Sequence, residues 1–308
     1  MTRTRGTEKQ YIEIAEQILV RYQEESSLTW GDDVLKFCEW FLERSKDWSF
    51  ATWRLYKAAI IFFMKNNGPK EAVSFLDAAK WSSSAYKKGS RNTSAQKAKS
   101  FPKKDLDKLL STLNTKRGQF DQLLSLWLFV GLMVGLRPSE WDTAIVENDI
   151  LIVQNAKRTN GRSFGDKRQI LLTNITDAEK DRLLAFLDQF DEFKKQGFSY
   201  QYIYDRCRKR MWEISRLALP RRKVYPTLYS CRHQVAAELK SSGYTLKEIA
   251  VLFGHASDAT ATRHYGHASQ GSGKFDKIQA PVEDLGRIRE KKKGYDPKNK
   301  QSKREIAR

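Results

Sequence analysis

Three short segments, far apart in the chain, carry side chains that suit phosphate chemistry. "GLRPSE" contains Arg137, "YSCRH" contains Arg232 and His233, and "LFGHASDATATRHYGHA" contains His255 and Tyr265. Phosphoryl transfer spreads negative charge over non-bridging oxygens, and planar guanidinium groups match that geometry. A tyrosine can act as a covalent nucleophile when cationic neighbours ease its ionisation. No Asp/Glu cluster for Mg²⁺ stands out, so the residues predict phosphodiester chemistry without a metal or another cofactor.

The same stretches have plainer interpretations, which remain open at this point. Arg137 could cap a helix C-terminus, and His255 after Gly254 could be a turn residue. His264 and His267 with His255 suggest a metal site, but they lack a carboxylate or thiolate at zinc spacing. Residues 245–265 could instead form a DNA-reading helix-turn-helix, which would not explain Arg137.

Taken in order, the three segments resemble the tyrosine recombinases, also called phage-type integrases. In that family an arginine in a GLR-x-x-E context precedes a His-x-x-Arg, an L-G-H segment and a nucleophilic tyrosine; Arg137, Arg232, His255 and Tyr265 match these positions. The resemblance implies that Tyr265 forms a 3′-phosphotyrosyl link while the two arginines hold the non-bridging oxygens. It implies an assisting role for His255.

The family also carries a lysine on a β-hairpin, which protonates the leaving 5′-oxygen. Lys157 in "ILIVQNAKRTNGR" is the best-placed match, with Lys167 in reserve. The chain departs from the family at Tyr229, which stands where His-x-x-Arg has its histidine, and at Phe253 before the Gly-His pair. A phenol donates a hydrogen bond but does not titrate near neutrality. Tyr244 is an alternative nucleophile that lacks the motif context.

The charge of the chain points to a polyanionic partner. The 308 residues include 56 Lys and Arg against 37 Asp and Glu, a formal net charge of +19. Such an excess costs self-repulsion unless a polyanion offsets it, and double-stranded DNA is the first candidate. The N-terminus lacks the apolar segment of a secretory signal, and the apolar run at 123–136 is too short to span a membrane. Three scattered cysteines fit reduced thiols in a cytoplasm. With the resemblance to phage-type integrases, we expect a cytoplasmic, bacterial or phage-associated protein with no membrane contact.

Composition predicts two folded domains and a mainly α fold with a small β-sheet. We expect an N-terminal helical bundle at 1–86 with four or five helices, one capped by Thr29 and another by Ser49, and an α+β catalytic domain of the tyrosine-recombinase type at 105–270. The bundle corresponds to the family's core-binding, DNA-binding domain. The linker at 87–104 has seven basic residues and no acidic one, and we expect these to lie along a phosphate backbone: Lys87, Lys88, Arg91, Lys97, Lys99, Lys103 and Lys104.

Within the catalytic domain, a buried helix at 121–136 ends near Gly135 and Pro138. Two short strands flank an Asn148-Asp149 turn, and "RQILLT" is a third strand after a loop with an Asn160-Gly161 turn. "TDAE" and "TLKE" read as capping boxes that open two later helices. The C-terminal tail at 271–308 is expected to be polar, basic and flexible unless bound.

The resemblance therefore predicts a site-specific recombinase or integrase of a mobile genetic element. Recombination of two duplexes implies a homo-oligomer, which we expect to be a tetramer on DNA, with the tail docking on a neighbouring subunit. Two alternatives remain: a catalytically silent DNA-binding relative, and a topoisomerase-like enzyme that relaxes DNA with the same chemistry.

Overall fold

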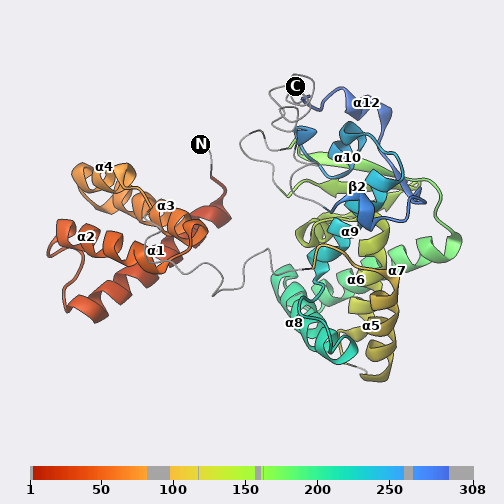
Figure 1. Ribbon diagram of the computed structural model, residues 1–308, viewed down its shortest axis with the longest axis horizontal. Helices are drawn as coiled ribbons and strands as arrows, with labels where there is room; N and C mark the ends of the chain where they lie inside the picture. The colour runs from red at the N-terminus through yellow and green to blue at the C-terminus, as the bar shows by residue number, and fades with distance from the viewer. Residues whose placement is uncertain are drawn as a thin grey trace, which may run out of the picture. The chain divides into compact units, whose positions relative to one another are not determined.

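The molecule is mainly α-helical with one small antiparallel sheet, as the sequence predicts (Figure 1). The computed structural model describes residues 3–81, 98–116, 118–156, 161, 163–259 and 266–290. The chain divides into two compact units, Met1–Asn92 and Thr93–Arg308. Each unit has its own hydrophobic core.

The first unit is a bundle of four α-helices: α1 (Arg5–Ser26), α2 (Val34–Arg44), α3 (Phe50–Asn67) and α4 (Lys70–Ala78). Ser49 caps α3 as predicted, because its side chain accepts a hydrogen bond from the amide of Thr52 at 3.1 Å. The predicted cap at Thr29 is wrong. Asp33 caps α2 by accepting from the amide of Lys36 at 2.9 Å, since a carboxylate is an equally good acceptor and lies directly before the helix.

The core of the first unit is rich in aromatic rings. Phe41 on α2 is fully buried and lies against the rings of Trp48 and Trp53, with centroids 5.2 and 5.4 Å away. Tyr22 and Phe37 pack edge to face in the same cluster. This aromatic packing joins α1, α2 and α3 into one folded unit.

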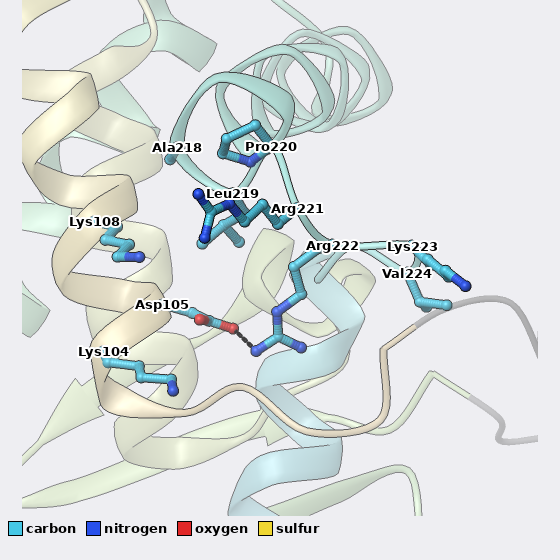
Figure 2. A pocket seen from close by; sticks show the side chains of 10 residues that line it. All are labelled: Lys104, Asp105, Lys108, Ala218, Leu219, Pro220, Arg221, Arg222, Lys223 and Val224. Atoms are coloured by element: carbon cyan, nitrogen blue, oxygen red, sulfur yellow. Dashed lines mark hydrogen bonds and ion pairs between the residues drawn. The ribbon is translucent and has the colours of Figure 1, made fainter.

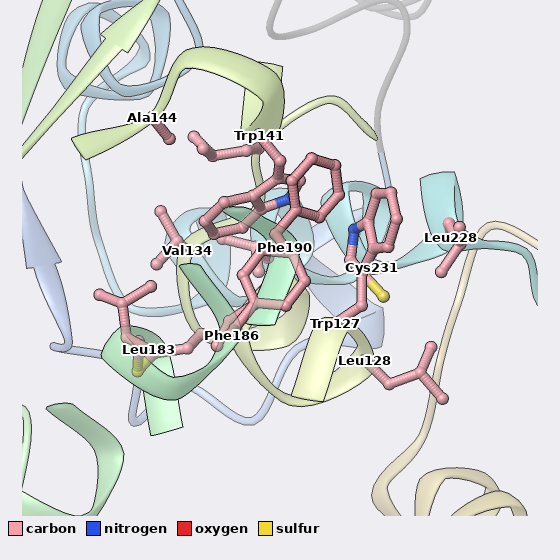
Figure 3. Close-up of a cluster of buried hydrophobic side chains, with 14 of the residues drawn as sticks. Trp127, Leu128, Val134, Trp141, Ala144, Leu183, Phe186, Phe190, Leu228 and Cys231 are labelled. Atoms are coloured by element: carbon pink, nitrogen blue, oxygen red, sulfur yellow. The ribbon is translucent and has the colours of Figure 1, made fainter. Parts of the chain in front are cut away.

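The second unit contains most of the helices. They are α5 (Lys103–Lys116), α6 (Asp121–Val134), α7 (Asp177–Lys195), α8 (Tyr200–Ala218), α9 (Leu228–Ser241), α10 (Leu246–Leu252) and the short α12 (Val282–Leu285), with 3-10 turns η3 (Pro138–Thr143) and η4 (Ala268–Gln270). Helix α6 is apolar along most of its length and packs against α7 and α9. Trp127 on α6 meets Phe186 and Phe190 of α7 in this core, shown in Figure 3. The buried helix that the sequence predicted is therefore central to this unit.

Four antiparallel strands form the sheet in the order β1-β2-β3-β4: β1 (Ile145–Glu147), β2 (Ile150–Gln154), β3 (Lys167–Leu172) and β4 (Ile278–Gln279). The predicted turn between the first two strands is confirmed, with φ of 47° at Asn148 and 62° at Asp149. Such left-handed residues make the tight turn whose twist matches a β-hairpin. The Asn160 half of the other predicted turn lies outside the described residues.

The sequence predicted a flexible tail from residue 271, but residues 271–290 are folded. Strand β4 pairs Ile278 with Leu172 of β3, and Tyr244 donates to the carbonyl of Ile278 at 2.8 Å. Helix α12 follows, and Ile288 is buried in a small cluster with Ala250 and Val251. Residues 271–290 thus belong to the folded second unit. In the part of the chain that the structure describes, no helix is long and apolar enough to cross a membrane.

Candidate active site

Arg137 is placed by the end of α6. Gly135 takes a left-handed conformation (φ 75°) and donates its amide to Gly131 at 2.9 Å, which closes the helix as the sequence predicts. A Cβ on Gly135 would lie 2.8 Å from the Cβ of Val235, so only glycine allows α6 to end so close to α9. Pro138 then begins η3, and Arg137 stands between the two helical segments.

The carboxylate of Glu140 holds the arginines together. It accepts hydrogen bonds from the amide and Nη1 of Arg137, at 2.8 and 2.6 Å. Arg232 approaches the same carboxylate, with Nη1 3.5 Å from Oε2. Glu140 is 1% exposed, so these ion pairs lie in a water-poor interior where they are strong. The sequence motif included Glu140 but predicted no role for it. In the structure Glu140 contacts all three of Arg137, Arg168 and Arg232.

Arg137 and Arg232 also converge on one oxygen. The carbonyl of Phe253 accepts from Nη1 of Arg137 at 3.3 Å and from Nη2 of Arg232 at 2.7 Å. Arg232 further donates to the carbonyl of Gly135 at 3.0 Å, and its guanidinium lies 4.0 Å from the centre of the Phe253 ring. Arg232 is fully buried, whereas Arg137 is 7% exposed. Two guanidinium groups thus aim donors at the same point from separate segments of the chain.

A third arginine, Arg168, was missed by the sequence reasoning. It lies on β3, is 1% exposed, and binds Glu140 through Nη2 at 2.8 Å. Its Nε donates to the carbonyl of Leu252 at 2.9 Å, and its Nη1 bonds the side chain of Asn155. The signal was available in "KRQILL", because a period of two puts Arg168 on the same buried face as Ile170 and Leu172. An arginine at an inward position of a strand requires buried partners.

The position of His255 depends on Gly254, where no residue with a Cβ would fit. Gly254 has φ of 64°, and a Cβ there would lie 2.1 Å from the side-chain oxygen of Asn155. This close approach brings the end of α10 against the sheet, and His255 follows with its amide bonded to Ala250 at 2.8 Å. His255 is 3% exposed. Burial, and then the charges of Arg232, Arg137 and Arg168, lower its pKa to about 2, so the imidazole is neutral.

The site is strongly electropositive. Three guanidinium groups, those of Arg137, Arg168 and Arg232, face one carboxylate and leave an excess of two positive charges. Burial alone would raise the pKa of Glu140, but the arginine charges outweigh burial and hold that pKa far below its usual range. The carboxyl is therefore ionised. A cluster of this charge, open to partial contact at Arg137, suits a phosphate group.

Tyr229 stands one turn before Arg232 on α9. Its ring packs edge to face with His233, with centroids 5.3 Å apart. Burial, followed by the charge of Lys99, lowers the pKa of His233 to about 4. The His233 ring is therefore uncharged near neutrality, and it contacts the ring of Tyr229, which stands where the family pattern has a histidine. Tyr229 lies on the first turn of α9, three residues before Arg232.

The structure brings Arg137, Arg232 and His255 together and leaves other predicted residues undescribed. Lys157, Tyr265 and His264, together with Lys87, Lys88, Arg91 and Lys97, lie outside the described residues. Lys167, Lys99, Lys103 and Lys104 are exposed. Among the residues described, no group of His, Cys, Asp or Glu could hold a metal ion.

Solved structures match the chain at low sequence identity and with TM-scores below 0.5. The XerA recombinase has a TM-score of 0.39 at 15% identity, over 87% of this chain and 90% of that one. The Tn1549 transposon integrase in complex with transposon right end DNA has a TM-score of 0.45 at 16% identity, over 83% and 89%. A lambda integrase tetramer bound to a Holliday junction has 0.43 at 14% identity, over 89% and 74%.

No protein-family profile and no curated protein sequence matches the chain. The resemblance is therefore carried by its own residues: an arginine after a buried helix, an arginine on the first turns of α9, and a Gly-His pair after α10, gathered around one carboxylate. In these residues the chain resembles the tyrosine recombinases.

Proposed function

We propose that this protein is a DNA strand transferase that cuts and rejoins duplex DNA through a 3′-phosphotyrosyl intermediate, as a site-specific recombinase of a mobile element does. The observation that supports the proposal is that Arg137 and Arg232 both donate to the backbone carbonyl oxygen of Phe253, at 3.3 and 2.7 Å, so their guanidinium groups lie within reach of one point. Two guanidinium groups held this close together can stabilise the negative charge of a phosphate in the transition state. Charge that is already fixed in place stabilises the transition state without reorganisation during the reaction.

In the proposed reaction the Tyr265 oxygen attacks the phosphorus and the bond from phosphorus to the 5′-oxygen breaks. Lys157 gives a proton to that oxygen, which leaves as a 5′-hydroxyl. Arg137 and Arg232 offset the negative charge on the phosphorus oxygens. Neutral His255 can donate from one ring nitrogen and accept at the other. A 5′-hydroxyl from a partner duplex then attacks the phosphotyrosine and returns its proton to Lys157, while the bond from phosphorus to the Tyr265 oxygen breaks. The number of phosphodiester bonds is conserved, so the reaction needs no ATP.

The wider role follows from this chemistry. The partner is double-stranded DNA, which the net charge of +19 favours. Exchange between two duplexes needs several active sites, and we propose a tetramer of this chain on two duplexes. The N-terminal bundle and the basic residues of 87–104 would hold the DNA, in a cytoplasmic setting in a bacterium or phage.

A nicked suicide substrate tests the proposal. Duplexes covering the DNA that flanks the gene, chosen for any short inverted repeats in it, are nicked near each candidate scissile phosphate, so that the short cleaved end diffuses away and the covalent intermediate accumulates. We expect wild type to form a denaturant-resistant protein–DNA adduct and Tyr265→Phe to form none. Removal of one well-placed cation, as in Arg137→Ala, should slow adduct formation by ~10²–10³.

Three other outcomes each have a clear meaning. Equal adduct in wild type and Tyr265→Phe would overturn the choice of nucleophile, and Tyr244→Phe is the matched comparison. Tight DNA binding with no adduct on any substrate would identify a catalytically silent relative. Relaxation of supercoiled plasmid without any dependence on the repeats would identify a topoisomerase-like enzyme.

A further inference from the structure

A hollow of about 600 Å³ lies in the second unit, between the start of α5 and the loop that joins α8 to α9 (Figure 2). Ten residues line it: Lys104, Asp105, Lys108, Ala218, Leu219, Pro220, Arg221, Arg222, Lys223 and Val224. Half of them are cationic and one is acidic. Figure 2 shows that Lys104 and Lys108 extend from α5 toward the loop that carries Arg221 and Arg222. No residue proposed for the reaction lines this hollow.

The shape of the hollow is fixed by one ion pair. Asp105 on α5 is 3% exposed and pairs with Arg222 of the loop. The amide of Arg222 donates to the carbonyl of Leu219 at 3.0 Å, and Leu219 is 4% exposed. The pair neutralises the only acidic residue of the lining. The loop is therefore anchored, and its remaining cations are held in place before any ligand arrives.

Four of the five cationic residues that line the hollow are not part of the Asp105–Arg222 pair. Within the described part of the chain, Lys104, Lys108, Arg221 and Lys223 make no ion pair, and each is exposed. Holding four positive charges around one hollow costs repulsion, which an anionic ligand relieves. One inorganic phosphate would use only part of this set. A run of phosphodiesters, with a charge about every 1.7 Å along a duplex, can engage all four.

The lining also distinguishes duplex from single-stranded nucleic acid. Sites for single strands stack the bases on aromatic side chains. None of the ten residues that line this hollow is aromatic. Its chemistry offers charge without stacking, which suits the backbone of a double helix whose bases stay paired.

The chain segment that enters α5 beside the hollow is hydrogen-bonded to α9, the helix that carries Arg232. The segment that leads into α5 is tied to α9, because Ser230 donates to the carbonyl of Ala98 at 2.6 Å and the amide of Phe101 donates to Gln234 at 2.8 Å. Lys99 and Lys103 are exposed on this segment, between Ala98 and the hollow. The loop itself runs directly into α9, which carries Arg232. Exposed cations thus extend from the start of α9 to the hollow.

We propose that this hollow is a second DNA-backbone site, in which Lys104, Lys108, Arg221 and Lys223 hold phosphates of duplex DNA next to the stretch where the reaction occurs. This inference rests on the proposed function only in taking duplex DNA as the partner. Its contribution is to affinity and register, since phosphate contacts orient a protein on DNA without reading its sequence.

The test measures how binding depends on salt. The probe is a random-sequence 40-base-pair duplex, with the full-length protein and a salt titration from about 50 to 300 mM. The variant Lys108→Ala/Arg221→Ala/Lys223→Ala leaves the Asp105–Arg222 pair intact. Each lost phosphate contact reduces the slope of log K against log salt by about 1. We therefore expect the slope to fall by about two to three and affinity at low salt to drop at least about tenfold.

A matched variant removes the same charge elsewhere. Lys116→Ala/Lys209→Ala/Lys274→Ala takes three exposed cations, which make no ion pair within the described residues, from other positions of the second unit, and thermal unfolding checks that both triple variants are folded. We expect it to change the slope by less than about one. An equal loss of slope in both variants, or no loss in the first, overturns the proposal. Equal affinity of wild type for a 40-nucleotide single strand overturns the duplex assignment.

The two proposals fail in different ways. A wild type that forms the covalent adduct, with an unchanged slope in the first triple variant, removes the backbone site and leaves the function intact. A slope that falls as expected, without any adduct from wild type, keeps the backbone site and makes the protein a silent DNA binder.

Discussion

The glutamate of the GLR-x-x-E stretch is the residue on which the candidate site depends. Removing two charges from water costs several kcal/mol per ion unless both are paired and hydrogen-bonded. Glu140 meets that condition by binding Arg137 and Arg168 directly and contacting Arg232. The guanidinium groups are thereby fixed before a phosphate arrives. Preorganised charge of this kind is what a phosphoryl-transfer site requires.

Arg168 gives the sharpest stability prediction. Arg168→Met removes one fully buried partner and leaves Glu140 and the carbonyl of Leu252 with fewer donors. We expect the free energy of unfolding to fall by about 3 kcal/mol, the low end for breaking a buried pair, because two other arginines still bind the carboxylate. Urea denaturation with an unchanged m-value measures the loss.

The control removes an exposed arginine from the same unit. Arg208→Met breaks a solvent-exposed pair with Asp205, and we expect a change below about 1 kcal/mol. An Arg168→Met protein within about 1 kcal/mol of wild type would show that the buried cluster does not hold the fold at this point.

Two buried histidines predict that acid destabilises the protein near neutrality. The folded-state pKa is about 2 for His255 and about 4 for His233, against an ordinary value of 6.5. The unfolded chain therefore binds protons below pH 6.5 that the folded chain cannot bind. This stability is complete above pH 6.5 and is lost as the pH falls, by about 1.4 kcal/mol per pH unit for each histidine.

The variant His255→Gln isolates one of these protons. Between pH 6.5 and 5 we expect the slope of unfolding free energy against pH to decrease by about 1 kcal/mol per unit on average, rising toward about 1.4 near pH 5, relative to wild type. Chemical denaturation at several pH values gives both slopes, and carboxylates shared by the two proteins cancel in the difference. His267→Gln, which removes an exposed imidazole, should keep the wild-type slope. Parallel slopes for wild type and His255→Gln would contradict the burial of a neutral His255.

At the level of elements, the segment after α12 ties two parts of the candidate site together. Arg289 donates its amide to Ala256 at 3.1 Å and its Nη2 to the carbonyl of Gly161 at 2.8 Å. Arg287 donates to the carbonyl of Phe164 at 3.3 Å, and Ile288 between them is 5% exposed. One short segment thus contacts both the loop between β2 and β3 and the residues that follow His255.

Ile288→Ala should loosen both contacts at once. Removing a buried isoleucine side chain costs about 2 kcal/mol at the low end of core substitutions, which suits a small cluster. If the free energy of local opening of this segment falls by that amount, amide hydrogen exchange at Asp258 and Arg289 should accelerate by about thirtyfold. Val282→Ala, at a side chain that is 79% exposed, is the matched control. Unchanged exchange at both amides would show that Ile288 does not hold the segment in place.

The elements that the sequence predicted are those with a strong local signal. The end of α6 at Gly135, the Asn148-Asp149 turn and the capping box at Thr176 need only neighbouring residues, and all three are confirmed. Strand β4 has two residues and exists because it pairs with β3, so no local pattern could reveal it. The motif predicted Arg137, Arg232 and His255 as one group, which the structure brings together. Arg168, which binds the same Glu140 carboxylate, was missed: the strand period places it on a buried face, but its partners are distant in the sequence and no local pattern identifies them.

At the scale of the whole molecule, the chain has two hydrophobic cores with no residue in common. Phe41 lies in the first, with its ring 5.2 Å from that of Trp48. Phe186 lies in the second, with its ring 5.0 Å from that of Trp141. Because most folding free energy comes from apolar burial, each core should define its own cooperative unit.

Calorimetry of the full-length chain should therefore show two unfolding transitions that respond to different substitutions. Truncation of a buried phenylalanine costs about 3–5 kcal/mol, which lowers the midpoint of a unit under 100 residues by at least about 12 °C and that of a larger unit by about half as much. Phe41→Ala should move the smaller transition and Phe186→Ala the larger one, with the other midpoint unchanged within about 1 °C. A single transition that both substitutions lower would mean that the two cores unfold as one, so that a change in either unit would also weaken the arginine cluster of the second.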